Sequence, residues 1–184
     1  MLWQLVGRAQ QLPPGAGVAA MPSCDPNAKL TPARTVAGFQ AGAPLRSRLT
    51  DAGERWPGLN LTGTVAGIRC GIIAGASVDI WHADGTGAVG AAAALWRARQ
   101  TTDALGRYTF DTIVPGAAIG QAPRINMRVS VPGKSTLTTA VFLPEAMAAA
   151  ANKHDRAYDP LLAMTLLSRT ADRASASFNV ILDL

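Results

Sequence analysis

Short runs in which apolar and polar residues alternate make up the middle of the chain, and glycine or proline turns separate them. In the run VDIWH, Val78, Ile80 and His82 lie on one face of an extended backbone, while Asp79 and Trp81 lie on the other. A period of two is typical of a β-strand. Patterns of this kind predict strands over residues 59–67, 72–82, 107–113, 125–131, 135–142, 161–168 and 175–184.

Helical composition is found in two places. Residues 144–153 (PEAMAAAANK) begin with a proline, carry Glu145 in the first turn and end on Lys153, which is the arrangement that the helix dipole favours. Residues 88–100 are rich in alanine and are predicted to be helical on propensity alone. An ordered loop is the alternative there, because Gly90 interrupts the start and no capping residue precedes it.

The pattern as a whole predicts an all-β protein, a β-sandwich with one short helix and long loops. Residues 1–22 are expected to form a flexible N-terminal arm, and a remnant of an export signal is the alternative interpretation. Residues 23–184 are expected to form one domain, in which residues 23–58 lack periodicity and lie as an extended segment over the core.

Composition excludes several classes of function. The chain of 184 residues has 48% hydrophobic and 16% charged residues, which is typical of a globular protein. Its net charge of +5 comes from scattered arginines, and no run of basic residues is interleaved with aromatics, so nucleic-acid binding is not predicted. No segment approaches the roughly 20 apolar residues of a transmembrane helix.

Cysteine usage bears on the compartment. The chain has 2 cysteines, Cys24 and Cys70, and we expect them to form a disulfide if the protein is exported and to be inert thiols if it is not. The pair favours a periplasmic or secreted protein, although the N-terminal residues carry no clear signal peptide.

Four motifs, in one order, give the chain a resemblance to a known family. They are LTGTVAG at 61–67, GASVDIWHADGTG at 75–87, TTDALGRYTFDTIVPG at 101–116 and VPGKSTLTT at 131–139. In these the chain resembles the intradiol ring-cleavage dioxygenases, and the similarity extends to LTP at 30–32 and to PEAM and HDRAYDP after residue 143. The resemblance implies a β-sandwich that binds a ferric ion through two tyrosines and two histidines and cleaves a catechol ring with O₂.

The resemblance also shows which residues stand at the positions of the iron ligands. The tyrosine positions hold Val89 and Ala118, and the histidine positions hold Arg124 and Asn126. The position of the family's catalytic arginine holds Gln121. Valine and alanine have no donor atoms, and an arginine brings a fixed positive charge to a place meant for a cation, so no cofactor is predicted.

The predicted function is therefore that of a catalytically degenerate member of this family. It would act as a structural or interaction module, as part of a larger assembly with a protein partner or as a homo-oligomer. Arg124 and Gln121 are the candidate ligand contacts in the vacated cleft, where the charge of Arg124 would receive an anionic group.

Two alternatives stay open. One is an iron-dependent dioxygenase or other oxidoreductase with a rearranged site made from the remaining candidate ligands, His82, Tyr108, His154 and Tyr158. The other is a carrier of a small aromatic, carbohydrate or anionic ligand in the cleft. We expect Tyr108 to be a core residue, His82 and Asp84 to belong to a hydrogen-bonded turn, and His154 and Tyr158 to cap the helix predicted over residues 144–153.

Overall fold

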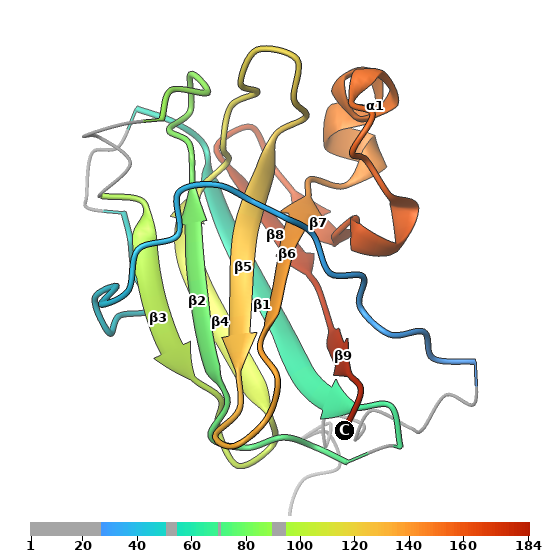
Figure 1. The fold of residues 1–184 in the computed structure, drawn as a ribbon. Coiled ribbons are helices and arrows are strands. Elements are labelled where there is room, and N and C mark those ends of the chain that lie inside the picture. Colours follow the sequence, from blue (N-terminus) through green and yellow to red (C-terminus); the bar gives the residue numbers. More distant parts are fainter. Residues whose placement is uncertain (1–26, 51–54, 70, 90–94) are drawn as a thin grey trace, which may run out of the picture.

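The computed structural model describes residues 27–50, 55–69, 71–89 and 95–184, and these form two β-sheets packed face to face (Figure 1). The predicted β-sandwich is confirmed. One sheet has the order β4-β1-β8-β7, with β9 paired to the end of β1, and the other has the order β3-β2-β5-β6. The elements are β1 (Gly58–Gly67), β2 (Ser77–His82), β3 (Arg97–Thr101), β4 (Arg107–Ile113), β5 (Arg124–Ser130), β6 (Leu137–Phe142), α1 (Glu145–His154), η2 (Pro160–Leu162), β7 (Thr165–Arg169), β8 (Arg173–Ser177) and β9 (Val180–Leu182).

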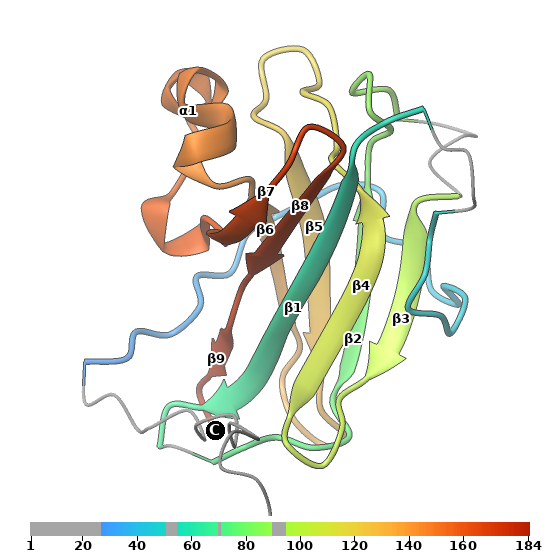
Figure 2. The ribbon, with the colours of Figure 1, turned by 180° about the vertical axis from the view of Figure 1, so that it is seen from behind.

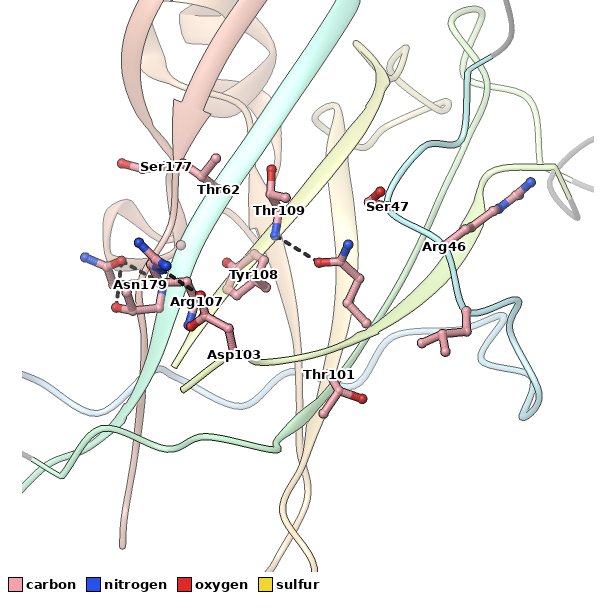
Figure 3. Close-up of a pocket in the computed structure, with 14 residues that line it drawn as sticks. Arg46, Ser47, Thr62, Thr101, Asp103, Arg107, Tyr108, Thr109, Ser177 and Asn179 are labelled. Atoms are coloured by element: carbon pink, nitrogen blue, oxygen red, sulfur yellow. Dashed lines mark hydrogen bonds and ion pairs between the residues drawn. The ribbon is translucent and has the colours of Figure 1, made fainter. Parts of the chain in front are cut away.

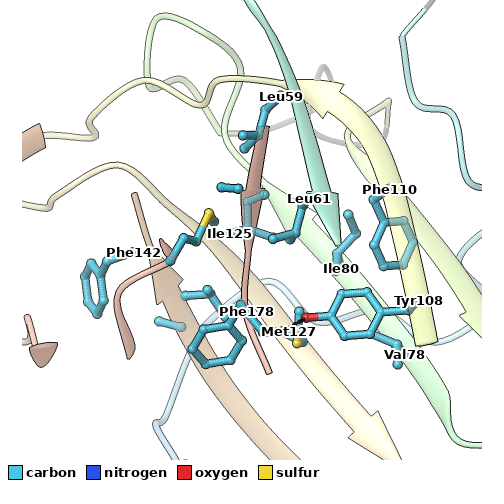
Figure 4. Packing of buried hydrophobic residues seen from close by; sticks show 14 of the residues in the cluster. Leu59, Leu61, Val78, Ile80, Tyr108, Phe110, Ile125, Met127, Phe142 and Phe178 are labelled. Atoms are coloured by element: carbon cyan, nitrogen blue, oxygen red, sulfur yellow. Dashed lines mark hydrogen bonds between the residues drawn. The ribbon is translucent and has the colours of Figure 1, made fainter. Parts of the chain in front are cut away.

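The core lies between the two sheets, where the inward residues of each strand meet (Figure 4). Leu59 and Leu61 of β1 and Val78 of β2 are fully buried there. Phe178, Val180 and Leu182 are buried as the alternation in the last segment predicted. Burial of apolar side chains from both sheets is the main force that holds such a sandwich together.

Strand β2 is buried on both faces because an extended segment crosses the outer side of its sheet (Figure 1). The indole nitrogen of Trp81 donates to the carbonyl of Ala37 over 2.8 Å, and the ring of Phe39 packs on that of Trp81 with centroids 5.5 Å apart. Arg97 donates to the side chain of Gln40 over 2.5 Å. The extended segment predicted before residue 58 is therefore observed, in its described part.

The same segment closes the open side of the sandwich. The N–H of Arg46 donates to the carbonyl of Arg99 in β3, and the N–H of Leu49 donates to that of Asp111 in β4. One extended stretch thus pairs with an edge strand of each sheet, and it covers backbone groups that would otherwise be unpaired.

Several predicted boundaries are wrong. The strand predicted from residue 72 begins only at Ser77, after a turn in which Gly75 has a φ of 75°. The helix predicted over residues 88–100 is wrong in its described part, because the chain forms a turn at 95–96 and then β3. Ala98 is fully buried opposite Ile80 of β2, so pairing with a neighbouring strand outweighs the helical propensity of alanine.

The C-terminal segments are more broken than predicted. Residues 161–168 divide into η2 and β7, and residues 175–184 divide into β8 and β9. Helix α1 is confirmed, but the group at its C-terminal cap is the N–H of Asp155, which donates to the carbonyls of Ala151 and Asn152. The predicted cap by His154 and Tyr158 is therefore wrong; Tyr158 packs on Phe142 instead.

Some expectations lie outside the described residues. These are the N-terminal arm over 1–22, the disulfide between Cys24 and Cys70, and the alanine-rich stretch at 90–94. Within the described part of the chain, no helix has the length and apolar character to cross a bilayer.

Candidate functional site

A cleft of about 390 Å³ opens where β5 begins, under the extended segment. Its wall contains all five positions at which the resemblance placed iron ligands or the catalytic arginine: Val89, Ala118, Gln121, Arg124 and Asn126. The remaining wall is apolar or small and comes from the extended segment and two loops, with Thr35, Val36, Ala37, Ala83, Gly116 and Ala122. Residues that are far apart in the sequence thus meet in one place.

Two loops bring Val89 and Ala118 to the cleft, and Asp84 organises the first of them. One carboxylate oxygen of Asp84 accepts from the N–H and the hydroxyl of Thr86 and from the N–H of Ala88, over 2.7–3.0 Å. The hydrogen bond from the Thr86 hydroxyl is the main reason that the pKa of Asp84 lies below its usual range. The turn predicted at Asp84 is therefore observed, and it is structural.

The second loop is packed directly on the first. Gly116 donates to the carbonyl of Asp84 over 2.8 Å. Gly87 has a φ of 86°, and a Cβ there would lie only 2.1 Å from the carbonyl oxygen of Ala117. Only glycine allows this approach of the two backbones, so the two loops keep a fixed relation to each other.

Arg124 is held inside the protein by two partners. One terminal guanidinium nitrogen, Nη1, lies 3.2 Å from Asp155 Oδ2, and the other, Nη2, donates to Gln121 over 2.5 Å. The two charged side chains are 19% and 5% exposed. The positive charge that we expected to be available to an anion is therefore already paired within the protein.

Sequence reasoning did not identify Asp155 as part of this site. It accepts from the N–H of Ala122 over 2.8 Å as well as from Arg124, and its other oxygen accepts from the N–H of Ala157. The only signal in the sequence was its place in the HDRAYDP motif. That motif gives no indication that Asp155 contacts Arg124, which lies 31 positions earlier.

Asn126 carries a buried acceptor with no partner. Its side-chain oxygen, Oδ1, is inaccessible to solvent and has no hydrogen bond among the described residues. Asn126 lies between Trp81 of β2 and Ala140 of β6 in the sheet and also lines the cleft. A buried carbonyl oxygen without a donor costs about 1–3 kcal/mol, and a ligand would reach it only after the Asn126 side chain turned towards the cleft.

The residues of the cleft do not fit the ferric ion that this fold family implies. Val89 and Ala118 have no donor atoms, and Arg124 adds a cation. The ligand positions then offer only the amide oxygen of Asn126, and a neutral amide is a poor ligand for Fe(III), which prefers phenolate and carboxylate oxygens. The chemistry of iron cannot be assigned to this cleft.

The alternative metal ligands have other roles in the core. Both ring nitrogens of His82 are engaged at 2.7 Å, one with the carbonyl of Ala83 and one with the hydroxyl of Thr112. Burial lowers the pKa of His82 to about 4, so the ring is neutral near pH 7. Tyr108 donates to the carbonyl of Phe178 over 2.6 Å, and burial raises the pKa of its phenol. Neither side chain is free to bind a metal without breaking a buried hydrogen bond.

The other two candidates are elsewhere. His154 is exposed at the end of α1, and burial together with Glu145 raises the pKa of Tyr158 to about 12. Among the described residues, no three histidine, cysteine, aspartate or glutamate side chains are close enough to hold a metal ion. A rearranged metal site therefore has no geometric support in the described part of the chain.

The chain is similar in fold and sequence to solved structures of dioxygenases. The dioxygenase domain of a dioxygenase carbohydrate-binding protein fusion from Streptomyces sp. SirexAA-E is 30% identical, with a TM-score of 0.78, and the match covers 85% of this chain and 99% of that domain. Catechol 1,2-dioxygenase from Pseudomonas arvilla C-1 is 26% identical, with a TM-score of 0.68, over 81% of this chain and 61% of that one.

A third structure shows the same fold at lower identity. The intradiol ring-cleavage dioxygenase from Tetranychus urticae is 20% identical, with a TM-score of 0.73, over 85% of this chain and 96% of that one. No protein-family model and no curated protein sequence matches the chain.

Proposed function

Because the chain belongs to the intradiol ring-cleavage dioxygenases, we propose that it is a catalytically inactive member of that family, which acts as a structural or interaction module. The observation that carries this proposal is the cleft itself. The positions of the four iron ligands converge there, and they hold Val89, Ala118, Arg124 and Asn126.

The pairing of Arg124 supports the proposal further. An arginine that had merely replaced a histidine would leave an unpaired charge in a partly buried place, which is costly. Here Asp155 and Gln121 satisfy it. The cleft is thus a consistent structure without iron, rather than an iron site with one ligand missing.

The first experiment measures metal content and the visible absorption spectrum of the purified protein. The proposal expects no bound iron and no visible band, and no oxygen uptake with catechols. Stoichiometric iron with a broad visible band and oxygen uptake would contradict it, and a dioxygenase with a rearranged site would then be the better account.

A second experiment tests the residue placement by restoring the ligands. The variant V89Y/A118Y/R124H/N126H is expected to bind ferric iron and to gain the visible absorption of a phenolate–iron complex. The matched control is V89F/A118F/R124H/N126H, which has rings of similar size without the phenol oxygens. A band in neither variant, with both folded, would show that these residues are not placed as iron ligands.

A second candidate function is that of a carrier for a small aromatic molecule in the cleft. The largely apolar wall of the cleft favours it, and a turn of the Asn126 side chain would bring its unpartnered Oδ1 to the ligand. Since Asp155 already pairs the charge of Arg124, a neutral ligand with one hydroxyl donor fits better than an anion. Titration with phenol and benzoate tests this: tighter binding of benzoate would contradict it.

The partner and the compartment are further parts of the proposal. Val89 is 74% exposed and Ile119 is fully exposed, so an apolar rim lies on the two loops that form the cleft, and such a rim suits a protein partner or a second copy. Light scattering during size-exclusion chromatography measures the assembly. Export predicts that Cys24 and Cys70 are oxidised, and thiol titration under denaturing conditions checks this.

A further inference from the structure

A second and larger hollow lies on the other sheet. It has a volume of about 910 Å³, and its floor is the outer face of β4, β1 and β8 (Figure 3). Residues 45–47 of the extended segment and 100–101 of β3 form one wall, and Asn179 stands on the opposite side. The hollow shares no residue with the cleft, so its role is independent of the function proposed above.

A row of hydroxyl groups crosses the floor. Thr109 of β4 and Ser177 of β8 are each the direct partner of Thr62 of β1, and all three side chains line the hollow. Figure 3 shows them next to one another on the three strands. Adjacent strands are about 4.8 Å apart, so the hydroxyls repeat at roughly that spacing. For Thr109 and Ser177, no side-chain hydrogen bond is found within the described residues.

Next to this row of hydroxyls, two more uncharged polar side chains line the hollow, those of Thr64 and Asn179. Thr64 donates through its N–H and its hydroxyl to the amide oxygen of Asn179, over 3.1 Å each. The amide nitrogen of Asn179 remains as a donor, and the side chain of Leu45, which is 70% exposed, supplies an apolar surface at the wall. The floor is therefore rich in hydroxyl groups, and Leu45 is the apolar member of a wall that is otherwise polar.

The charged groups of the hollow are occupied by one another or by the backbone. Arg107 pairs with Asp103 over 2.8 Å. Arg46 donates to the carbonyls of Leu95 and Arg97 over 2.5–3.2 Å. A strongly anionic ligand would compete with these contacts, whereas a neutral ligand leaves them intact.

We propose that this groove binds a neutral oligosaccharide. Sugar hydroxyls both donate and accept hydrogen bonds. The serine and threonine hydroxyls and the amide groups that line the groove do the same, so a sugar can be the donor or the acceptor in each contact. The short side chains of Thr62, Thr109 and Ser177 let a flat sugar ring approach the sheet, and Leu45 offers contact to its C–H groups. An extended chain of sugars matches an open groove better than a compact ligand does.

The test is an NMR titration of the ¹⁵N-labelled protein with hexamers of β-1,4-linked glucose, xylose and N-acetylglucosamine, and with a galacturonate oligomer as the acidic probe. The expected result is saturable binding of at least one neutral hexamer, with shift changes centred on the amides of Thr62, Thr109 and Ser177. No saturable binding by the panel, or shift changes centred elsewhere, would overturn the proposal. Binding of the galacturonate oligomer alone, weakened by salt, would also overturn it.

A matched pair of variants sharpens the result. Thr62→Val with Thr109→Val removes two hydroxyls and keeps the branched shape that a strand favours, so binding is expected to weaken about tenfold. The control is Thr165→Val on β7, which lies outside the groove and leaves the affinity unchanged. Equal affinity of the double variant and the wild type would rule out the hydroxyl row as the site. If the double variant does not fold, the map of shift changes on the wild type decides the question.

Discussion

Asp155 and Arg124 lie 3.2 Å apart, side chain to side chain, and together they tie the start of β5 to the end of α1. Arg124 lines the cleft at a position where the family resemblance places one ligand of a cation, and Asp155 pairs with its guanidinium. Removal of one partner from a buried pair leaves the other charge unpaired, and that cost exceeds what the intact pair contributes.

Asp155→Asn is therefore expected to lower the free energy of unfolding by about 3 kcal/mol. Urea denaturation at pH 7 measures the change. The control is Asp103→Asn, which changes an exposed carboxylate that pairs with Arg107 and caps a turn, and its effect is expected to be clearly smaller. Equal effects of the two substitutions would show that the Arg124 pair has no special role in the cleft.

Gly63→Ala is expected to destabilise the fold by about 3 kcal/mol through overpacking. A Cβ at this position would lie 1.9 Å from the carbonyl oxygen of Phe178 and 2.6 Å from the phenol oxygen of Tyr108. Gly71→Ala is the control, because nothing lies within 4 Å of a Cβ there. Thermal denaturation compares the two, and a Gly63 variant as stable as the wild type would mean that β1 and Phe178 can separate at little cost.

His82 is expected to make the protein less stable in acid. Its pKa is about 4 in the folded protein and about 6.5 in the unfolded chain, so the unfolded chain binds the extra proton over this range. The stabilisation is fully present above pH 6.5 and is lost as the pH falls towards 4, by up to about 3 kcal/mol. Burial raises the pKa of Asp79, and this acts in the opposite direction.

Urea denaturation of the wild type and His82→Gln between pH 7.5 and 4.5 isolates the contribution of His82. The difference in stability between the two proteins is expected to shrink as the pH falls. His154→Gln serves as the control, because it replaces the other histidine of the chain, whose side chain is exposed on α1. A constant difference between the wild type and His82→Gln would contradict the prediction.

Phe39→Ala is expected to loosen the extended segment over β2. The ring of Phe39 packs on Trp81 and lies 4.3 Å from the guanidinium of Arg128, and the two contacts together are worth about 1–2 kcal/mol. Hydrogen exchange should rise in residues 36–42 while the strands stay protected. Phe39→Leu, which keeps an apolar side chain without the ring, should give a smaller rise; the same rise in both would assign the effect to apolar burial alone.

Local patterns predicted the sandwich because a strand with one buried face shows alternating apolar and polar residues over a few positions. The alternation around Leu59, Leu61 and Val65 of β1 reports a strand with one buried face, and these residues are buried as predicted. The same approach gave the wrong element at residues 97–100, where it predicted a helix and the structure has β3. Alanine propensity is a local property, whereas the burial of Ala98 against Ile80 depends on a strand far earlier in the chain.

The candidate site was predictable only in part, for the same reason. The types of residue at the ligand positions are visible in the sequence, and they already exclude the donors that iron requires. Three other features are not visible in the sequence. They are the pairing of Arg124 with Asp155, the buried Oδ1 of Asn126 that has no donor, and the row of hydroxyls in the second groove.

By itself, then, the sequence determined most of the strands, the family and the types of residue at the positions where the resemblance places iron ligands. Each of these depends on residue type and on spacing within a few positions. Only the tertiary structure decided the charge of the cleft and the alignment of Thr109, Thr62 and Ser177 across three strands. Those properties arise from contacts between distant segments, and the register of such contacts is set by how the whole core packs.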